Sequence, residues 1–451
     1  MSQTALEMAN TLKCMERIYS HKFGLASKAT LASVLKHLDV PAVGCNYTVG
    51  NVIPMYLSSV SDADGYDGGS ASSLNLAKSR IKTFGEFMER YCANYTEGEW
   101  GGKTYFDSHS NLSAKGVACL DFADLITFAD NLYNDPQFPY AKYSADSLIS
   151  WIEGEDLIRK GKTMLPAQKV FLGFPYPKDE LIYTHAMSTG LACGSSYAHA
   201  ALSAIYEVIE RDSFMLTWLF KMPGIRIEID SIRDSYLWEL YNHIRKYLIG
   251  EDCLFIYDIS RTKGVWTILT FIRNDMPDAY GLIVSSASHT NPELALIKAL
   301  EELCQSQSFA YQNLFKECGK QYQCLEKTEL DTLHKHFFYY STGRHGKNID
   351  FISSSDRSTR LSKMVNYSRK TYDDELEYLT LLFRDNCQSL YIADVTKPEI
   401  CSSGFFVLKA IISEYVDLVP SHKFKNQKNS RLQDFREKFG AELNDDPHPF
   451  P

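Results

Sequence analysis

Two segments of the chain carry the same pattern of charges, Glu-x-x-Glu-Arg, and each stands at the same distance from a glycine. One copy is Glu86–Arg90 and the other is Glu207–Arg211. Gly69 lies 17 residues before the first glutamate of one copy, and Gly190 lies 17 residues before that of the other. A weaker third copy has the same spacing over residues 285–302. This internal repeat predicts a recurring unit in which a loop of small residues leads into a charged helix.

Apolar residues recur at helical spacing behind each of these loops. Helices are expected at Leu74–Tyr95, Tyr197–Phe220 and Pro292–Tyr311. Strands are expected at Leu254–Ile259, Val265–Ile272, Leu282–Ser285 and Phe405–Ile412. Loops are expected at Ser61–Ser73 and Ser353–Ser362, which are rich in small and polar residues. Long helices interspersed with strands predict an α/β (α+β) fold in which mixed sheets pack against long helices.

The composition excludes several classes of protein. With 47 basic and 56 acidic residues among 451, the net charge is −9, and without a basic stripe nucleic acid is not the expected partner. A hydrophobic fraction of 45%, with 25 Phe and 28 Tyr, supplies a large core and excludes a disordered chain. The 11 cysteines show no metal-binding spacing, and neither a signal peptide nor an apolar run of ~20 residues occurs. We therefore expect a cytoplasmic protein that does not enter a membrane.

The charges on the first and second helices have different explanations. Glu86 and Arg90 stand four residues apart, the spacing of an ordinary surface ion pair. The second helix is apolar around most of its circumference and is expected to be buried. Its polar stripe consists of Ser203, Glu207, Glu210 and Arg211. Buried carboxylates must meet cations or become neutral, so this stripe indicates either a structural network of ion pairs or a bound metal ion.

Taken together, the three helices suit Mg²⁺ and a nucleoside triphosphate. They carry five carboxylates, those of Glu86, Glu89, Glu207, Glu210 and Glu302. Mg²⁺ prefers oxygen ligands and commonly shares them with the phosphates of a nucleotide. Arg90 and Arg211 would then pair with phosphates, and the glycine loops could supply backbone amides. Because no Walker A sequence and no kinase glycine-rich loop occurs, a nucleotide site here is of another kind.

The chain resembles the YcaO family in several ordered motifs. Ser188–Gly194 followed by Ala200–Asp212 resembles the central signature of that family, a small-residue turn leading to Glu-x-x-Glu-Arg-Asp. Gly68–Arg90 is similar to its first motif and Leu294–Gln307 to its third. Pro447–Pro451, with three alternating prolines, is similar to the ending of the azoline-forming branch. The resemblance implies a YcaO-type ATP-binding fold and the activity of an ATP-dependent peptide cyclodehydratase.

In the azoline-forming branch, a Cys, Ser or Thr side chain of a ribosomal precursor peptide attacks the preceding amide carbonyl. The amide oxygen is phosphorylated by ATP and leaves as phosphate, so that a thiazoline or oxazoline ring remains. The products are thiazole/oxazole-modified peptides, bacteriocins included. The resemblance implies that Mg²⁺ is held by Glu86, Glu89, Glu207, Glu210 and Glu302. We expect ATP to contact Lys82, Arg90, Ser203, Arg211 and Gln305.

The three prolines stiffen the C-terminal tail into a rod of the polyproline-II type. Such a rod could hold the carboxylate of Pro451 inside the active site, whereas a frayed end would gain little from alternating prolines. We therefore expect Pro451 to be catalytic, as an orienter or a proton acceptor. The expected organisation is an N-terminal region (1–60), a YcaO catalytic domain (61–420) and the tail (421–451).

The family resemblance also implies partners. This length leaves no room for a fused leader-binding module, so we expect a separate E1-like leader-binding protein and a ribosomal precursor peptide. In this family a flavin-dependent dehydrogenase often joins them and oxidises azoline to azole. We expect the chain to form a homodimer within this larger synthetase complex.

Two departures from the family pattern keep other functions open. Gln307 stands where the third motif often ends in arginine, and His199 stands where a glutamate is frequent. A subunit with these changes could bind nucleotide and serve as a scaffold of a peptide-modifying complex. The other alternative is a YcaO enzyme that makes thioamides or amidines, and the proline-rich ending speaks against it.

Overall fold

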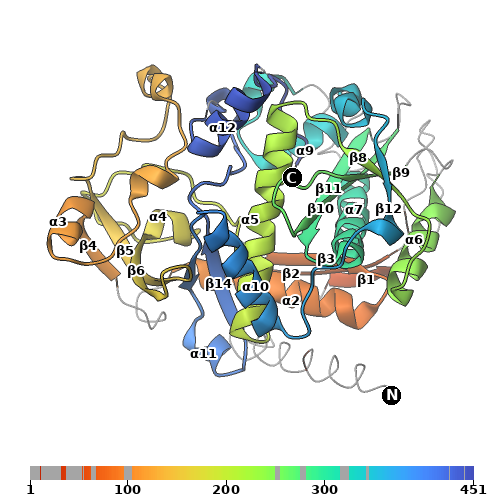
Figure 1. The fold of residues 1–451 in the computed structure, drawn as a ribbon, viewed down its shortest axis with the longest axis horizontal. Coiled ribbons are helices and arrows are strands. Elements are labelled where there is room, and N and C mark those ends of the chain that lie inside the picture. The colour runs from red at the N-terminus through yellow and green to blue at the C-terminus, as the bar shows by residue number, and fades with distance from the viewer. Residues whose placement is uncertain are drawn as a thin grey trace.

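The computed structural model shows, within its described residues, long helices packed among three β-sheets (Figure 1). The described residues are 11, 32–36, 53, 55–61, 68–95, 104–248, 254–274, 281–314, 325–341, 345–425, 427–440 and 442–450. The predicted α/β (α+β) class with mixed sheets is confirmed. Across these residues, no helix has both the length and the apolar character needed to cross a membrane.

The first sheet and the third sheet are antiparallel, and the second sheet contains one parallel pair. The first sheet has the order β1 (Ala32–Lys36), β2 (Tyr56–Ser61), β3 (Gly68–Ser73). The second has the order β11 (Leu282–His289), β10 (Trp266–Arg273), β9 (Leu254–Asp258), β8 (Ile225–Glu228), β12 (Ser358–Arg360), and β8 with β12 is the parallel pair. The third has the order β4 (Thr104–Ser108), β5 (Leu148–Asp156), β13 (Tyr391–Asp394), β14 (Phe406–Ile411), β7 (Leu191–Gly194), with β6 (Gly161–Pro166) also paired to β5.

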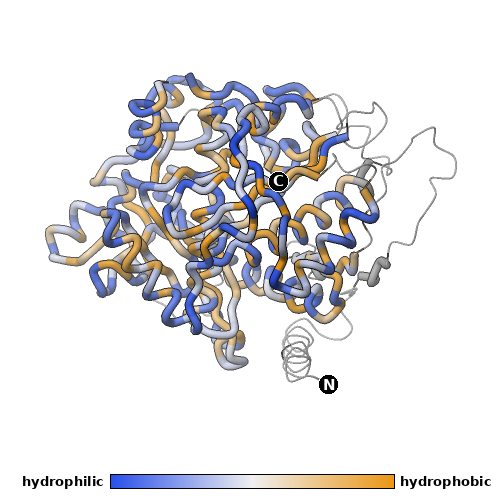
Figure 2. Tube along the Cα trace, turned by 45° about the vertical axis from the view of Figure 1, so that its right-hand side comes forward, coloured by the Kyte–Doolittle hydropathy of each residue, from blue (hydrophilic) through white to orange (hydrophobic). Residues whose placement is uncertain are grey.

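Three long helices pack between these sheets. They are α2 (Leu76–Ala93), α5 (Tyr197–Leu219) and α7 (Pro292–Leu314). The shorter helices are α3 (His109–Ala114), α4 (Ala167–Val170), α6 (Ser235–Tyr247), α9 (Leu333–Ser341), α10 (Tyr372–Asp385), α11 (Pro398–Cys401) and α12 (Ser430–Phe439). In Figure 2, hydrophobic and hydrophilic segments alternate along the helices, as expected where one helix face is packed and the other is solvated.

The long helices join the three sheets into a closed ring. Helix α2 packs on β2 and β3 of the first sheet and on β7 and β14 of the third. Helix α5 packs on β7 and β14 and on β10 and β11 of the second sheet. Helix α7 packs on β10 and β11 and returns to β3. Each helix therefore lies on the strand that precedes it in the sequence and on a strand of the next sheet, and α5 runs through the middle of the molecule (Figure 1).

The expected positions of the three long helices are confirmed, and side-chain caps explain where two of them begin. The side chain of Asn75 accepts a hydrogen bond from the amide of Lys78 at the start of α2. Ser196 does the same for the amide of His199 at the start of α5. Helix α5 is buried along nearly its whole length, as its apolar circumference predicted.

The expectation of a loop over Ser61–Ser73 is wrong for its second half, because β3 occupies Gly68–Ser73. This strand pairs with β2, and its small residues allow its backbone to lie close against α2. The expected loop at Ser353–Ser362 likewise contains β12, which is only three residues long. In both places glycine and serine were interpreted as turn residues, although the pairing of a distant strand decides the backbone conformation.

The close approach of β3 to α2 requires glycine at position 69. A Cβ atom added to Gly69 would lie 2.7 Å from the amide nitrogen of Phe87 and would also collide with the carbonyl oxygen of Thr83. We expect Gly69→Ala to lower the free energy of unfolding by about 1–3 kcal/mol, because two backbone segments must separate. Gly85 lies in α2 and has nothing within 4 Å of an added Cβ. Gly85→Ala should therefore raise the free energy of unfolding by about 0.5–1 kcal/mol. Urea unfolding of both variants measures the contrast, and equal effects would contradict this account.

Candidate active site

A glutamate on each long helix is held by the strand that precedes the helix or, for α5, by the turn just before that strand. The three pairs are the amide of Ser70 with Glu86 (2.7 Å), the amide of Gly190 with Glu207 (3.0 Å) and the hydroxyl of Ser285 with Glu302 (3.3 Å). The partners are separated by 16, 17 and 17 residues along the chain. A hydrogen bond between each long helix and the segment just before it thus recurs three times; the second and third bonds have the 17-residue spacing, whereas the first starts from Ser70 rather than from Gly69.

The residue three positions after each of these glutamates binds a strand of the next sheet in the ring. Glu89 accepts a hydrogen bond from the amide of Cys193 in β7 at 2.9 Å. Glu210 accepts one from the hydroxyl of Ser286 in β11 at 3.0 Å. The third contact closes the ring, since Gln305 donates to the carbonyl and the hydroxyl oxygen of Ser70 in β3 at 3.1 and 2.9 Å. We call these residues, Glu86, Glu89, Glu207, Glu210, Glu302 and Gln305, the central ring.

Cations accompany the central ring. Arg90 donates to Glu86 at 2.8 Å, the ion pair expected from their spacing. Arg211 lies 3.2 Å from Glu210 and 3.5 Å from Glu207. Among the described residues, neither Nε nor Nη1 of Arg211 has a hydrogen-bond partner, although both atoms are buried. Unsatisfied guanidinium donors beside carboxylates suit an anionic ligand such as a phosphate.

Three carboxylates of the central ring, those of Glu89, Glu210 and Glu302, have raised pKa values and so resist ionisation. Burial raises the pKa of Glu89 well above its usual range, with Glu207 and Glu86 adding repulsion. Burial also raises the pKa of Glu210 to about 8, with Arg211 opposing the shift and Glu302 adding to it. The pKa of Glu302 is raised as well, mainly by burial. A divalent cation among these groups would favour their ionised forms, so the donor set fits Mg²⁺.

The central ring does not form a ready-made cage of ligands. Within the described part of the chain, no three His, Cys, Asp or Glu side chains are grouped so that they could hold a metal ion. The hydrogen bonds to strand amides and hydroxyls keep these carboxylates apart. Mg²⁺ is usually bound by one or two carboxylates together with waters and nucleotide phosphates, so this arrangement is compatible with a site completed by the nucleotide.

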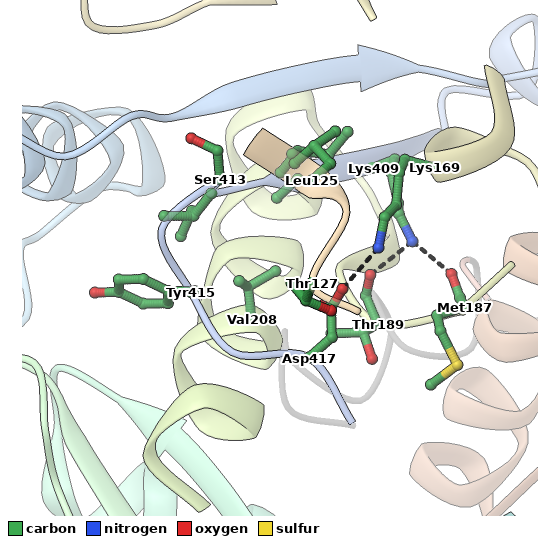
Figure 3. Close-up of a pocket in the computed structure, with 13 residues that line it drawn as sticks. Leu125, Thr127, Lys169, Met187, Thr189, Val208, Lys409, Ser413, Tyr415 and Asp417 are labelled. Carbon is green, nitrogen blue, oxygen red and sulfur yellow. Dashed lines mark hydrogen bonds and ion pairs between the residues drawn. The ribbon is translucent and has the colours of Figure 1, made fainter. Parts of the chain in front are cut away.

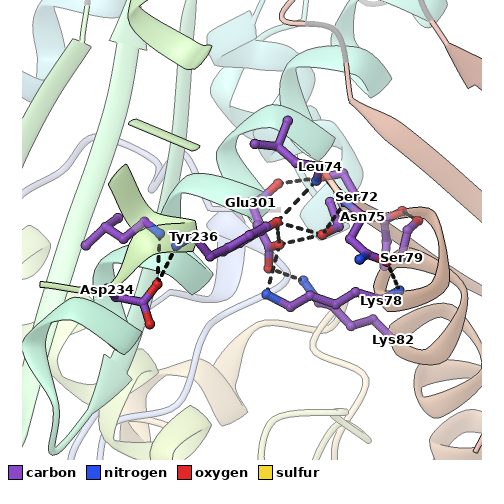
Figure 4. A network of polar contacts seen from close by, with 12 residues as sticks. Ser72, Leu74, Asn75, Lys78, Ser79, Lys82, Asp234, Tyr236 and Glu301 are labelled. Atoms are coloured by element: carbon purple, nitrogen blue, oxygen red, sulfur yellow. Dashed lines mark hydrogen bonds and ion pairs between the residues drawn. The ribbon is translucent and has the colours of Figure 1, made fainter. Parts of the chain in front are cut away.

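The remaining expected ATP contacts lie at the edge of the central ring. Lys82 pairs with Glu301 at 3.2 Å in a network that also includes Lys78 and the hydroxyls of Ser73 and Tyr236 (Figure 4). The positive charge of Lys82 also acts on Glu302. Ser203 is half-buried on α5, one helical turn before Glu207. Lys82 thus binds a carboxylate next to Glu302 in the sequence, and Ser203 shares α5 with Glu207.

The C-terminal tail returns to α5. The indole of Trp218 donates to the carbonyl of Asp446 at 3.0 Å, and Pro447, His448, Pro449 and Phe450 are buried. The ring of Phe450 lies 4.1 Å from the guanidinium of Arg211 and 4.7 Å from the ring of Phe214. Through Phe450 the tail therefore contacts Arg211, the arginine that pairs with Glu207 and Glu210 of the central ring. Pro451, the expected catalytic residue, lies outside the described residues.

His422 and His448 of the tail gather around His336 of α9. His448 stacks on His336 at 4.3 Å, the ring of His336 hydrogen-bonds the carbonyl of His448 at 2.9 Å, and the ring of His422 lies beside them. Burial lowers the pKa of His336 and of His422 to about 4, and that of His448 well below its usual range. Protonation of these rings would place cations next to one another in a buried site.

We therefore expect acid to weaken the docking of the tail. In the unfolded chain His336 takes up a proton near pH 6.5, whereas in the folded protein it does so only near pH 4. The stability that comes from a neutral His336 is therefore complete above pH 6.5 and is lost as the pH falls toward 4. The loss amounts to about 3 kcal/mol for this residue. The measurement is urea unfolding of wild type and of His336→Phe across this pH range. The difference between their free energies of unfolding isolates His336, because the buried glutamates, whose raised pKa values act in the opposite direction, contribute equally to both proteins. A difference that does not change with pH would contradict the expectation.

The two departures from the family pattern have local structural partners. Gln307 is buried and accepts a hydrogen bond from the amide of Ile53 at 3.0 Å, so it anchors the segment just before β2. His199 stacks on Tyr372 of α10 at 4.5 Å and lies 3.3 Å from the hydroxyl of Ser195.

Lys298 is the site residue that the sequence prediction omitted. Burial lowers the pKa of Lys298, and the negative charges of Glu302 and Glu210 oppose that shift. The ammonium of Lys298 is therefore close enough to both carboxylates to interact with them. The available signal was its position on α7, four residues before Glu302 and on the same face as Gln305.

Residues 70–416 match the family model described as YcaO cyclodehydratase, ATP- and Mg²⁺-binding. The chain belongs to the YcaO family. The predicted cofactors, ATP and Mg²⁺, are thereby confirmed, as is the membership of an ATP-dependent enzyme family. The expected YcaO-type fold is confirmed by solved structures.

The solved structures that resemble this YcaO chain share its fold at low sequence identity. A heterocyclase in complex with substrate and cofactor has a TM-score of 0.69 and 16% identity, covering 88% of this chain and 53% of its own. YcaO from Methanopyrus kandleri, bound with AMPPCP and Mg²⁺, has a TM-score of 0.60 and 15% identity, covering 91% of each chain. The E. coli microcin synthetase McbBCD complex has a TM-score of 0.58 and 16% identity, covering 86% of this chain and 91% of its own.

One curated relative is an uncharacterized protein of Methanothermobacter thermautotrophicus. It is 22% identical over 269 residues, which cover 58% of this YcaO chain and 66% of the relative. This chain thus spans slightly less than two thirds of that relative and about half of the heterocyclase.

Proposed function

We propose that this YcaO protein is the cyclodehydratase subunit that forms azolines in a ribosomal precursor peptide. A Cys, Ser or Thr side chain of the peptide would attack the preceding amide carbonyl and form the ring. ATP supplies the phosphoryl group that turns the amide oxygen into a leaving group. The observation that carries the proposal is the buried tail, which brings Phe450 onto Arg211 beside the carboxylates of the central ring.

The chain's own residues would divide the work. Mg²⁺ would be held by Glu86, Glu89, Glu207, Glu210 and Glu302, and ATP would contact Lys82, Arg90, Ser203, Arg211 and Gln305. The unsatisfied donors of Arg211 would bind phosphate oxygens and stabilise charge that develops there, without reorganisation of solvent. Lys298, half-buried on α7, would add a second cation for the same purpose. The carboxylate of Pro451 would orient the peptide or accept the proton of its nucleophile.

We further propose that the chain acts within a complex. The microcin synthetase with a similar fold is an assembly of several subunits, and it has also been solved with pro-MccB17 bound. By analogy, an E1-like protein would bind the leader of the precursor peptide, and a flavin-dependent dehydrogenase would oxidise azolines. A homodimer within this complex and the division into 1–60, 61–420 and 421–451 belong to the same proposal.

Reconstitution with a candidate E1-like protein and precursor peptide tests the proposal. We expect the peptide to lose the mass of one water for each ring, and phosphate to be released in proportion. Exchange of oxygen for sulfur in the peptide would identify a thioamide-forming enzyme instead. A scaffold subunit would bind nucleotide but leave the mass of the peptide unchanged. The control for this outcome is the same partner complex with a known cyclodehydratase subunit in place of this chain, which must be active.

A further inference from the structure

A buried lysine lies behind the glycine turn that supports Glu207. Lys409 belongs to β14, the strand between β13 and β7, and only 3% of it is exposed. Its ammonium donates to the carbonyl oxygens of Met187 and Thr189, both at 2.6 Å (Figure 3). A charged residue in the middle of an otherwise apolar strand is costly unless its charge is used, so these two bonds need an explanation.

One peptide unit links this ammonium to the central ring. The Thr189 carbonyl that accepts from Lys409 and the Gly190 amide that donates to Glu207 belong to the same peptide bond. A cation at the oxygen of a peptide polarises it and strengthens the hydrogen bond given by its N–H. The order of contacts is therefore ammonium, carbonyl, amide and carboxylate, from Lys409 to Glu207.

The turn itself is built so that this peptide has one orientation. Gly190 has a φ of +84°, and an added Cβ would lie 2.5 Å from the carbonyl oxygen of Ala410 and 2.8 Å from the side chain of Val208. The carbonyl of Gly190 accepts a hydrogen bond from the amide of Ala410 at 2.8 Å. Strand β14 thus holds the turn twice, through the backbone of Ala410 and through the side chain of Lys409.

The charges around Lys409 agree with this link. Burial lowers the pKa of Lys409 to about 8, and the negative charges of Glu207 and Asp417 oppose that shift. Asp417 is already paired with Lys169 at 2.8 Å across the same small pocket, which has a volume of about 40 Å³ (Figure 3). Of the two lysines in this pocket, Lys169 is paired with the carboxylate of Asp417, whereas the ammonium of Lys409 is held by two carbonyl oxygens.

We propose that Lys409 is a positioning residue for Mg²⁺ binding, which acts on Glu207 through the Thr189–Gly190 peptide. This inference rests on the proposed function, in which Glu207 is a metal ligand. Residues that orient a ligand from behind typically change metal affinity by about 10–100-fold when they are removed. Lys409 would hold the carboxylate of Glu207 in place before any metal binds, and this would raise the affinity of the site for Mg²⁺.

The test is a titration with Mg²⁺, monitored by calorimetry, at a fixed and saturating concentration of AMPPCP. We expect Lys409→Met to raise the Mg²⁺ concentration for half-saturation at least about 10-fold. Lys169→Met is the matched control, because it removes the other lysine of the pocket and leaves the turn untouched, and it should not change that concentration. Should Lys409→Met fail to fold, Lys409→Gln retains a polar donor, and the same loss is expected.

Two further measurements separate positioning from mere packing. Without metal or nucleotide, amide exchange over residues 187–194 should be faster in Lys409→Met than in Lys169→Met. In a Glu207→Gln background, Lys409→Met should weaken binding no further, because its target has been removed. Equal Mg²⁺ affinity of wild type and Lys409→Met, or an equal loss in the Lys169→Met control, would overturn the inference. A wild type that binds no AMPPCP with Mg²⁺ would instead overturn the proposed function.

Discussion

Replacing Glu210 by glutamine should abolish the Mg²⁺-dependent stabilisation of this protein by ATP analogues. At a hundredfold excess of ligand over Kd, wild type should gain about 2.7 kcal/mol in free energy of unfolding. The variant should gain nothing measurable, because a neutral amide cannot replace an anionic ligand of a hard cation. Thermal unfolding with and without Mg²⁺ and AMPPCP provides the measurement.

The variant is expected to fold, since the pKa of Glu210 is raised to about 8 by burial and glutamine resembles the protonated acid. Glu375→Gln is the matched control. Glu375 is also buried, but it binds the hydroxyls of Tyr206 and Thr290 away from the central ring, so its loss should leave the ligand effect intact. Full stabilisation of Glu210→Gln by the ligand would show that the carboxylates form a structural network only.

A peptide tag appended after Pro451 should abolish ring formation while Mg²⁺ and AMPPCP still bind. Phe450 is only 2% exposed and packs on Arg211 and Phe214, so added residues would have to grow from a buried position. The tail would be displaced from the site, and misplacement of a catalytic group by about 1 Å can cost about 100-fold in rate.

Peptide mass spectrometry of the reconstituted reaction measures ring formation, and calorimetry measures nucleotide binding. The same tag at the N-terminus is the control and should leave both unchanged. Unimpaired turnover by the C-terminally tagged protein would remove the tail from the mechanism. A parallel loss of nucleotide binding would mean that the tail is needed for the folded site rather than for the reaction on the peptide.

The sequence predicted local features well because they depend on neighbouring residues. The apolar periodicity located α2, α5 and α7, and the 17-residue spacing corresponds to the bond between Gly190 and Glu207. The expected ion pair of Glu86 and Arg90 follows from the geometry of one helix turn.

Features that depend on long-range pairing could not be predicted in this way. The bond from Gln305 to Ser70 joins residues that are 235 positions apart, so its partner is visible only in the fold. Lys409 lies in the expected strand Phe405–Ile412, but nothing in the sequence singled it out, because its proposed role depends on the pairing of β14 with β7. The same pairing problem explains why β3 is predicted as a loop. The cluster of His336, His422 and His448 likewise joins α9 to two separate parts of the tail, which share no sequence pattern.

The position of β14 in the third sheet has a consequence for how the protein is made. Strands β4, β5 and β7 are synthesised long before β14, yet β14 is the strand that joins β7 to β13. Until it pairs, the turn at Gly190 lacks both the amide of Ala410 and the ammonium of Lys409. Contacts of such large sequence separation form late and slowly. On the proposed function, a growing chain therefore carries all five glutamates well before β14 can orient Glu207, so metal binding would begin only after β14 has paired.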